Sequence, residues 1–270
     1  MSLPTLFLSH GSPAFALTPG RAGALLGEVG RSLPRPRAVL IVSPHWITHE
    51  PVAASAAAPQ TVHDFGGFPQ ALYALRYPAP GAPGLVDEVA TLLSHKGLTI
   101  SSDPARGLDH GAWVPLMHVY PAADVPVLQV SQPDTPSPAA LLEFGRALAP
   151  LRETGVLVIG SGSLTHNLRE FFGGIDAPAY AQAFADWMWA QIIAGDLDAL
   201  LDYRRRAPEA VRAHPSDEHL LPLFFAIGAA GAQWAEAVRL EAGISDGVLS
   251  MDGFLFGAGS APLPAAATRS

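Results

Sequence analysis

Short runs of apolar and β-branched residues alternate along the chain with longer segments in which apolar residues recur at helical spacing. Residues 38–43 read Ala-Val-Leu-Ile-Val-Ser, a run with no polar position before its last residue, which is typical of a strand buried on both faces. The same pattern predicts further strands at residues 5–9, 52–56, 98–102, 125–130 and 155–160. Helices are predicted at residues 21–33, 83–96, 138–152, 179–194 and 220–227. We therefore expect an α/β fold with a central mixed, largely parallel sheet flanked by helices in three layers.

The last part of the chain carries two more strand-like runs, at residues 237–241 and 247–251, separated by a turn rich in Gly, Ser and Asp. This spacing predicts a hairpin at the edge of the sheet. No internal repeat and no long linker divides the chain, so we expect a single domain over residues 1–257. Residues 258–270 are mostly small and rich in proline, and we expect them to form a loosely ordered tail.

Composition narrows the class of protein and its partners. Hydrophobic residues make up 49% of the chain and charged residues only 15%, against roughly 25% charged in an average soluble domain, so a large core is expected. The formal net charge is −8 and no basic run interrupts it, which argues against a nucleic acid or an anionic membrane as partner. The absence of cysteine excludes disulfides, thiolate metal sites and cysteine nucleophiles.

Two features bear on the compartment. Residues 1–8 lack a basic region and a long apolar segment, so no signal or transit peptide is visible there. The most apolar run, residues 220–232, contains Pro222 and is shorter than the roughly 20 residues that a membrane span needs. We therefore expect a cytoplasmic protein whose partner is a small molecule, and the sequence leaves open whether it forms a homo-oligomer.

Histidines follow three of the predicted strands. His10 comes after residues 5–9, His45 after residues 38–43, and His166 after residues 155–160. Any one of them alone is more often an isolated histidine in a turn. The carboxyl ends of neighbouring parallel strands converge on one crevice, however, so three such histidines can meet in space. Because imidazole is the commonest metal ligand, this recurrence favours a shared metal site.

Two further candidates extend this set. His110 lies in a Leu-Asp-His-Gly turn, and the adjacent Glu218 and His219 precede the last predicted helix. Without thiolates, two or three imidazoles and a carboxylate suit Fe(II), Zn(II) or Mn(II). Two histidines with Glu218 would form the facial triad of non-haem iron enzymes, whereas three histidines including His219 would leave the metal less determined. The sequence does not decide which of the two adjacent side chains points inward.

A glycine-rich segment, Gly-Ser-Gly-Ser-Leu at residues 160–164, invites comparison with phosphate-binding and nucleophile motifs. It lacks the lysine of a Walker motif and the third glycine of the dinucleotide fingerprint. It also lacks the G-x-S-x-G spacing of a nucleophile elbow. We therefore exclude both functions for this segment.

Six short motifs, taken together and in order, resemble those of the 4,5-DOPA-type extradiol dioxygenases. These enzymes belong to the class III extradiol ring-cleavage dioxygenases and are related to the β-subunit of protocatechuate 4,5-dioxygenase. The resemblance covers nearly the whole chain and implies that residues 1–257 form the catalytic domain. The motifs are H-G-S-P at residues 10–13, S-P-H-W at 43–46, H-D-F-G-G-F-P at 63–69, L-D-H-G at 108–111, L-T-H-N at 164–167 and E-H-L-L-P-L at 218–223.

The resemblance implies a role for each histidine. His10, His45 and His219 would bind the metal. His166 would lie beside the metal as the catalytic acid and base, and it could add a further ligand. His110 would be a second catalytic histidine that bonds the substrate or bound oxygen.

For the substrate, the resemblance implies a pocket lined or covered by residues 63–69. His63 would be the most direct participant, with Phe65 beside it in the substrate-binding segment. Arg106 and Arg76 lie near the pocket motifs and could hold a substrate carboxylate through the guanidinium fork, although a surface role is equally compatible with the sequence.

An enzyme of this family would use Fe(II) to insert O2 into the ring of a substituted catechol such as DOPA or caffeate. Zn(II) has no redox chemistry and could occupy the site without supporting turnover. The same ligands around a metal-bound water would instead suit a zinc-dependent hydrolase, and the scaffold could also serve a non-catalytic metal- or ligand-binding protein. The expected partners are a small catecholic compound and O2.

Overall fold

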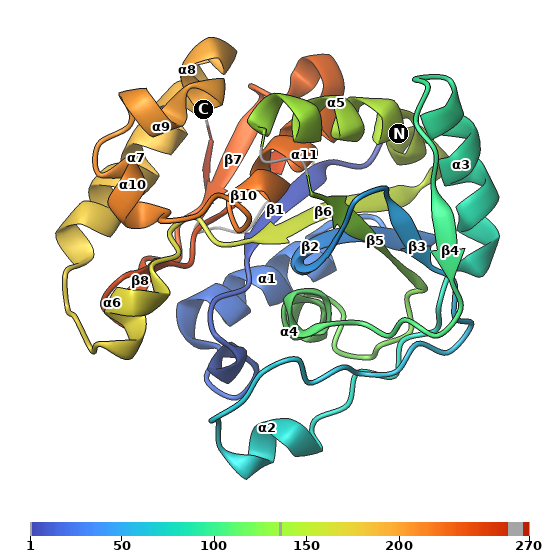
Figure 1. Ribbon diagram of the computed structural model, residues 1–270, viewed down its shortest axis with the longest axis horizontal. Helices are drawn as coiled ribbons and strands as arrows, with labels where there is room; N and C mark the ends of the chain where they lie inside the picture. Colours follow the sequence, from blue (N-terminus) through green and yellow to red (C-terminus); the bar gives the residue numbers. More distant parts are fainter. Residues whose placement is uncertain (1, 135–136, 259–266, 270) are drawn as a thin grey trace.

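A central sheet organises the molecule. The computed structural model describes residues 2–134, 137–258 and 267–269, and among these nine strands form one sheet in the order β11-β7-β10-β1-β6-β2-β5-β3-β4 (Figure 1). The strands are β1 (Thr5–Ser9), β2 (Ala38–Thr48), β3 (Val52–Ala54), β4 (Ser101–Asp103), β5 (Val127–Pro133), β6 (Val156–Gly162), β7 (Ala237–Leu240), β10 (Gly253–Phe256) and β11 (Ala267–Arg269). A separate ribbon pairs β8 (Ile244–Ser245) with β9 (Leu249–Ser250).

Four parallel strands form the centre of the sheet. β1 pairs with β6, β6 with β2, and β2 with β5, all in parallel. Beyond β1, the strands β10, β7 and β11 are antiparallel to their neighbours. Beyond β5, β3 is antiparallel to β5 and β4 is parallel to β3. The prediction of a mixed sheet with parallel strands at its centre is therefore confirmed.

Helices cover both faces of this sheet. The α-helices are α1 (Gly20–Ser32), α2 (Gln70–Ala74), α3 (Val86–Ser94), α4 (His110–Val119), α5 (Pro138–Leu148), α6 (Leu168–Phe172), α7 (Pro178–Ala194), α8 (Leu197–Leu201), α9 (Tyr203–Arg206), α10 (Ala210–Ala213) and α11 (Leu221–Ala230). Short 3₁₀ helices occupy Pro13–Ala16, Pro83–Leu85, Ala149–Thr154 and Gly231–Gln233.

The two faces of the sheet form two hydrophobic cores. Leu6 and Leu8 of β1 belong to the core that includes residues of α1 and α4, whereas Phe7 belongs to the other core, which includes residues of α3, α5, α7 and α11. Figure 1 shows α1 and α4 on one side of the sheet and α5 and α11 on the other. This alternation follows from the period of two in a strand, and it gives the predicted three layers. All three side chains are buried, as expected for a strand whose both faces are covered by helices.

The edge hairpin predicted near the end of the chain is wrong in its pairing. β7 pairs with β10 rather than with residues 247–251, and β9 pairs with β8 in the separate ribbon. The loop between β7 and β10 is closed by Asp252, whose Oδ1 accepts from the backbone of Ala242 and Gly243 and whose Oδ2 pairs with Arg239. The Gly/Ser/Asp turn belongs to the tip of this loop.

Two further expectations from the sequence concern the C-terminal tail and membrane-spanning helices. Most of the tail predicted to be loosely ordered, residues 259–266 and 270, lies outside the described residues, while Ala267–Arg269 form β11 against β7. Within the described ranges, no helix combines the length and apolar character required to cross a membrane.

Candidate active site

The carboxyl ends of the central parallel strands bring the first histidines together. His10 directly follows β1, and its backbone N–H donates to the carbonyl of Gly162 at the end of β6 (2.9 Å). His45 lies on β2, where the register with β5 shifts between Ser43 and Ile47. Since these strands run in parallel, their ends share one edge of the sheet. The ring centroids of His10 and His45 are 5.1 Å apart.

His110 enters the site from the first turn of α4. Asp109 caps this helix by accepting from the backbone N–H of Ala112 (3.2 Å), and this cap fixes where His110 begins the helix. The rings of His45 and His110 are 3.9 Å apart. A Cβ on the next residue, Gly111, would overlap Ser43 and lie 2.9 Å from the His45 ring, so a glycine is required where α4 meets β2.

His219 comes from the segment before α11. A Cβ on Gly162 would overlap the carbonyl oxygen of His219, so the glycines at the end of β6 allow this segment to lie against the strand. This close approach explains why glycines occupy the end of β6, and no phosphate-binding role is needed to explain them. The His219 ring lies 5.5 Å from that of His10 and 5.0 Å from that of His45, and it stacks on the His166 ring at 3.4 Å.

Hydrogen bonds behind the rings fix the tautomer of His10. The Ser161 hydroxyl donates its single proton to the carbonyl of Gly111, so its oxygen accepts from the Nδ1–H of His10 at 3.0 Å. In the neutral ring, Nε2 is then a bare lone pair that points into the cluster. Outer partners of this kind orient metal-binding histidines in proteins.

Two acidic side chains, Glu218 and Asp64, lie close to Nδ1 of the other histidine rings. Oε1 of Glu218 lies 3.0 Å from Nδ1 of His219, which donates to it, and 3.9 Å from Nδ1 of His166. The hydrogen bond to Glu218 places the proton of His219 on Nδ1 and a lone pair on its Nε2. Oδ2 of Asp64 lies 3.7 Å from Nδ1 of His45, so a negative charge faces that side of the His45 ring.

The inward-facing nitrogens fit a divalent cation. Nε2 of His10 and Nε2 of His45 are 3.2 Å apart, a distance at which the two nitrogens either share a proton in a hydrogen bond or both bind one cation. Nε2 of His219 is buried and has no hydrogen-bond partner among the described residues. Potential ligand atoms lie within 4.8 Å of one another in two groups, His10–His45–His110 and His166–Glu218–His219. Nitrogen donors of this kind suit Fe(II) and Zn(II) alike.

Burial keeps these rings neutral, which is the ligating form. It lowers the pKa of His10 and His219 well below the usual value, with the neighbouring histidines adding to the effect. Burial also lowers the pKa of His45 to about 3 and that of His166 to about 4. Burial alone would raise the pKa of Asp64, but its contacts with His110 lower it to about 2, so Asp64 is a carboxylate.

Asp64 anchors His110 as well as facing His45. Its Oδ1 accepts from the backbone N–H of His110 at 2.9 Å and lies 3.0 Å from Nδ1 of the same ring. One carboxylate therefore fixes the position of two neighbouring imidazoles.

A cavity of about 250 Å³ opens onto these histidines. The rings of His10, His45, His110, His166 and His219 all line it. Its remaining lining is Gly11, Ser12, Pro13, Asp64, Phe65, Gly66, Phe68, Leu168, Phe171, Phe172 and Leu249. The chemistry-bearing groups thus lie at one end of a cavity with mainly apolar walls, the arrangement typical of a small-molecule site.

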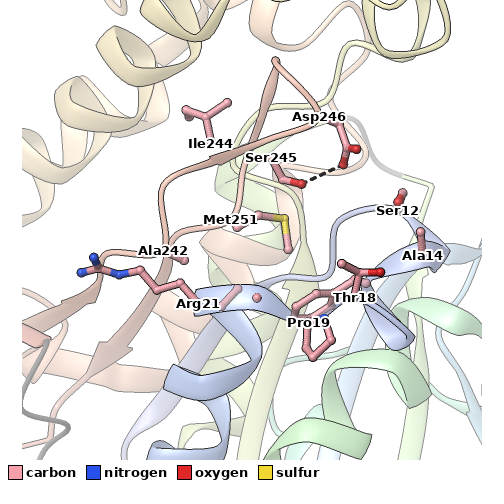
Figure 2. A pocket seen from close by; sticks show the side chains of 13 residues that line it. Ser12, Ala14, Thr18, Pro19, Arg21, Ala242, Ile244, Ser245, Asp246 and Met251 are labelled. Carbon is pink, nitrogen blue, oxygen red and sulfur yellow. Dashed lines mark hydrogen bonds between the residues drawn. The ribbon is translucent and has the colours of Figure 1, made fainter.

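A second cavity, of about 340 Å³, lies beside the first but contains none of these histidines. Figure 2 shows Met251 at its centre, the hydrogen-bonded pair Ser245 and Asp246 (2.8 Å) on one side, and Arg21 extending away from the other lining residues. Ser12 lines both cavities, so the segment after β1 separates them. The first cavity is therefore the candidate active site.

Of the ten residues singled out from the sequence, six line the active-site cavity and four, His63, Arg76, Arg106 and Glu218, lie outside its lining. The guanidinium of Arg76 donates to the carbonyls of Tyr73 and Leu75, both at 2.7 Å. The five histidines and Phe65 line the active-site cavity. His63 does not line it, and Nε2 of His63 donates to the carbonyl of Leu75 at 3.1 Å. Arg106 is also outside the lining, because its guanidinium lies over Trp46 and pairs with the buried Asp109 at 3.2 Å. Their roles in substrate binding stay predictions.

Sequence reasoning missed three contributors to the site. Asp64 follows His63 in the same motif, but neighbouring residues of an extended loop face opposite ways, so one of the two had to point elsewhere. Ser161 lies in the glycine-rich segment, which resembled only phosphate-binding and nucleophile motifs and gave no sign of a contact with a histidine. The apolar wall formed by α6 has no sequence signal beyond a Leu and two Phe after the L-T-H-N motif.

Comparison with known proteins identifies the family. The family model described as the catalytic LigB subunit of aromatic ring-opening dioxygenase matches residues 24–247. The chain is 38% identical over 257 residues to a 4,5-DOPA dioxygenase extradiol of Beta vulgaris, covering 93% of this chain and 96% of the relative. It is 38% identical over 255 residues to the protein of the same name from Escherichia coli K12, covering 92% and 93%.

A solved structure shares the fold. The crystal structure of an uncharacterized protein from Escherichia coli K12 superposes with a TM-score of 0.74 at 30% identity, covering 94% of this chain and 100% of that one. The chain therefore belongs to the LigB family of aromatic ring-opening dioxygenases and is a class III extradiol dioxygenase of the DOPA dioxygenase type.

Proposed function

We propose that the protein is an Fe(II)-dependent extradiol dioxygenase that opens the ring of a substituted catechol, with His10, His45 and His219 as the metal ligands. The observation that carries this proposal is the convergence of these three imidazoles, whose ring centroids lie 5.0 to 5.5 Å apart, with the buried Nε2 of His219 lacking a hydrogen-bond partner among the described residues. Ser161 and Glu218 accept hydrogen bonds from Nδ1 of His10 and of His219, which leaves Nε2 of both rings available for a metal. The relatives named for 4,5-DOPA make DOPA the first substrate to test.

Fe(II) held by His10, His45 and His219 would supply the Lewis-acid and redox chemistry that catechol activation and O2 insertion require. Three neutral ligands leave the charge of the ion undiminished, which favours a catecholate over a neutral catechol. The chain's own contribution is to hold the substrate at the cavity floor and to exclude water through the walls formed by Phe65 and Phe68.

Two further histidines are placed to move protons. His166 stacks on His219 and lines the cavity, so its ring can take a proton from a catechol hydroxyl and return it when the ring opens. His110 lies across the cavity with its ring held by Asp64, and we assign it the bond to a substrate oxygen. Asp64 itself acts through His110 and His45, whose Nδ1 atoms face its carboxylate.

Oxygen uptake by anaerobically reconstituted protein tests the proposal. Protein fully loaded with Fe(II) is mixed with O2 and a panel containing DOPA, caffeate and simple substituted catechols, and the zinc-loaded protein serves as the matched control because Zn(II) has no redox chemistry. We expect catechol-dependent uptake with iron and none with zinc. Full iron loading without uptake on any catechol would refute the proposal, and ester or amide turnover with zinc under strict anaerobiosis would favour a hydrolase instead.

A further inference from the structure

The segment that carries His166, residues 163–167, is held by hydrogen bonds to its backbone. The backbone N–H of Leu164 donates to the buried hydroxyl of Ser9, at the end of β1, at 3.1 Å. The backbone N–H of His166 donates to the carbonyl of Ala213, at the end of α10, at 2.7 Å. The segment is therefore fixed from the sheet on one side and from the chain after α10 on the other.

The buried side chain of His214 makes the next contact with this segment. Its Nε2 lies 2.9 Å from the carbonyl oxygen of Leu164, and none of the side chain is exposed. Burial lowers the pKa of His214 to about 4, so the ring is neutral and carries one proton. Because a carbonyl oxygen only accepts, that proton lies on Nε2. Nδ1 is buried and has no hydrogen-bond partner among the described residues, which agrees with an unprotonated Nδ1.

The contacts of Ala213 and His214 form two adjacent links to the chain around His166. The link from the Ala213 carbonyl is made by the backbone, so any residue could supply it. The link to Leu164 depends on a side chain with a donor at the position of the His214 Nε2 atom. The ring that these links hold in place, that of His166, stacks on the His219 ring at 3.4 Å with 11° between the planes.

We infer that His214 is a positioning residue, which holds the His166 ring parallel to the His219 ring through the carbonyl of Leu164. His214 does not line the active-site cavity, so it touches neither the substrate nor the candidate metal site. A buried carbonyl that loses its donor must move to find another, and Leu164 is two residues from His166. The consequence for catalysis rests on the proposed function, in which His166 moves protons.

Two substitutions at the same position separate the hydrogen bond from the space that the ring fills. His214→Leu removes the donor and keeps a side chain of similar size, whereas His214→Gln keeps an amide donor near the position of Nε2. In oxygen uptake by iron-loaded protein, we expect His214→Leu to lower kcat by about 10–100-fold, since a misplacement of about 1 Å can cost about 100-fold. KM should not change, and His214→Gln should recover most of the lost kcat.

Metal binding provides a second comparison for the same variants. The hydrogen-bond partners of His10 and His219, Ser161 and Glu218, do not contact His214 through any hydrogen bond of the described residues. We therefore expect the metal dissociation constant of His214→Leu, from chelator competition, to equal that of the wild-type protein.

Tyr203→Phe is the matched control for a loss of stability. The Tyr203 ring lies 6.5 Å from that of His214 and is 1% exposed, and its hydroxyl donates to Oδ1 of Asp217 at 2.6 Å. The substitution removes a hydrogen bond from the same buried cluster but none from residues 163–167. We expect it to lower Tm, as His214→Leu does, and to leave kcat unchanged.

Nuclear magnetic resonance of the metal-free protein reports the position of the ring without turnover. In the stack, the carbon-bound protons of the His166 ring lie over the His219 ring, whose ring current moves their signals upfield. His166→Ala identifies these signals by their loss. We expect His214→Leu to move them downfield, and His214→Gln and Tyr203→Phe to leave them in place.

Each outcome bears on either His214 or the proposed function. Wild-type kcat and unshifted His166 signals in His214→Leu would overturn the inference, and so would an equal fall of kcat in Tyr203→Phe. If His214→Leu does not fold, His214→Asn carries the same expectation, because its shorter amide does not reach the Leu164 carbonyl. Absence of oxygen uptake by the wild-type protein would refute the dioxygenase function instead, and the His166 signals would then decide the role of His214 alone.

Discussion

Replacement of Ser161 by alanine tests how the protein presets His10 for a metal. Ser161 is fully buried on β6, where its hydroxyl accepts from Nδ1 of His10 at 3.0 Å and donates to the carbonyl of Gly111. Alanine removes both contacts without adding volume. The His10 ring then loses the partner that keeps its proton on Nδ1, and the tautomer with a proton on Nε2 cannot bind a cation through that atom.

The expected size of the effect follows from these contacts. Loss of an outer partner of a metal-binding histidine weakens metal affinity by about 10–100-fold, which is about 1.4–2.8 kcal/mol of binding free energy. The buried donor and acceptor left unsatisfied also cost about 1–3 kcal/mol of unfolding free energy. Ser163→Ala separates the two effects, because the Ser163 hydroxyl is also buried but donates to the carbonyl of Thr165 at 2.7 Å. The contact of Ser163 with the carbonyl of His219 is made by its backbone N–H, which alanine keeps.

Competition titration with a metal chelator gives the metal dissociation constant of each protein, and thermal unfolding of the metal-free proteins gives the cost in stability. We expect both variants to lower the metal-free Tm and only Ser161→Ala to weaken metal binding. Wild-type metal affinity in Ser161→Ala, or an equal loss of affinity in Ser163→Ala, would contradict this reasoning. It would show that the hydrogen bond from His10 to Ser161 does not hold His10 in the tautomer with its proton on Nδ1.

Three other substitutions separate the roles within the site. His10→Ala or His45→Ala should lose bound metal in elemental analysis, and stoichiometric metal in either variant would remove that residue from the ligand set. His166→Ala should keep its metal but lose about 10²–10⁴-fold in turnover, the usual contribution of a proton-transferring group; a normal rate would eliminate that role. Arg106→Ala should lower Tm because the buried Asp109 loses its ion-pair partner. A rise in KM confined to carboxylate-bearing catechols would instead restore Arg106 as a substrate-binding residue.

The central parallel strands were predictable because their apolar runs are bounded by turns, whereas elements without such a run were not. The prediction ended the second strand at Ser43, but β2 continues to Thr48 through the register shift after Ser43. The sequence around His110 indicated only a turn, since Pro115 interrupts the helical pattern of α4. The helices α8, α9 and α10 are only four or five residues long, too short for a periodic pattern to identify them.

The convergence of the histidines was predictable from strand ends, and the choice between adjacent side chains was not. The sequence left open whether Glu218 or His219 faces the metal. In the structure the His219 ring stacks among the other rings, while Glu218 accepts from its Nδ1. His219 is thus the candidate metal ligand, and Glu218 is the hydrogen-bond partner behind it. The sequence does not reveal this division, because it depends on how the segment before α11 packs against the end of β6.

The site divides its tasks between two kinds of structural element. His10 follows β1, His45 lies on β2, His110 begins α4, and His166 and His219 lie in the segments after β6 and before α11; His10 is only 1% exposed. The cavity walls instead come from α6 and the loop before α2, and Phe172 on α6 remains 72% exposed. A substitution on α6 therefore changes the apolar wall of the cavity, whereas a change at Ser161 acts on the hydrogen bond of His10. Substrate preference and metal binding are in this way separable within one cavity, and relatives with the same histidines can differ in the catechols they accept.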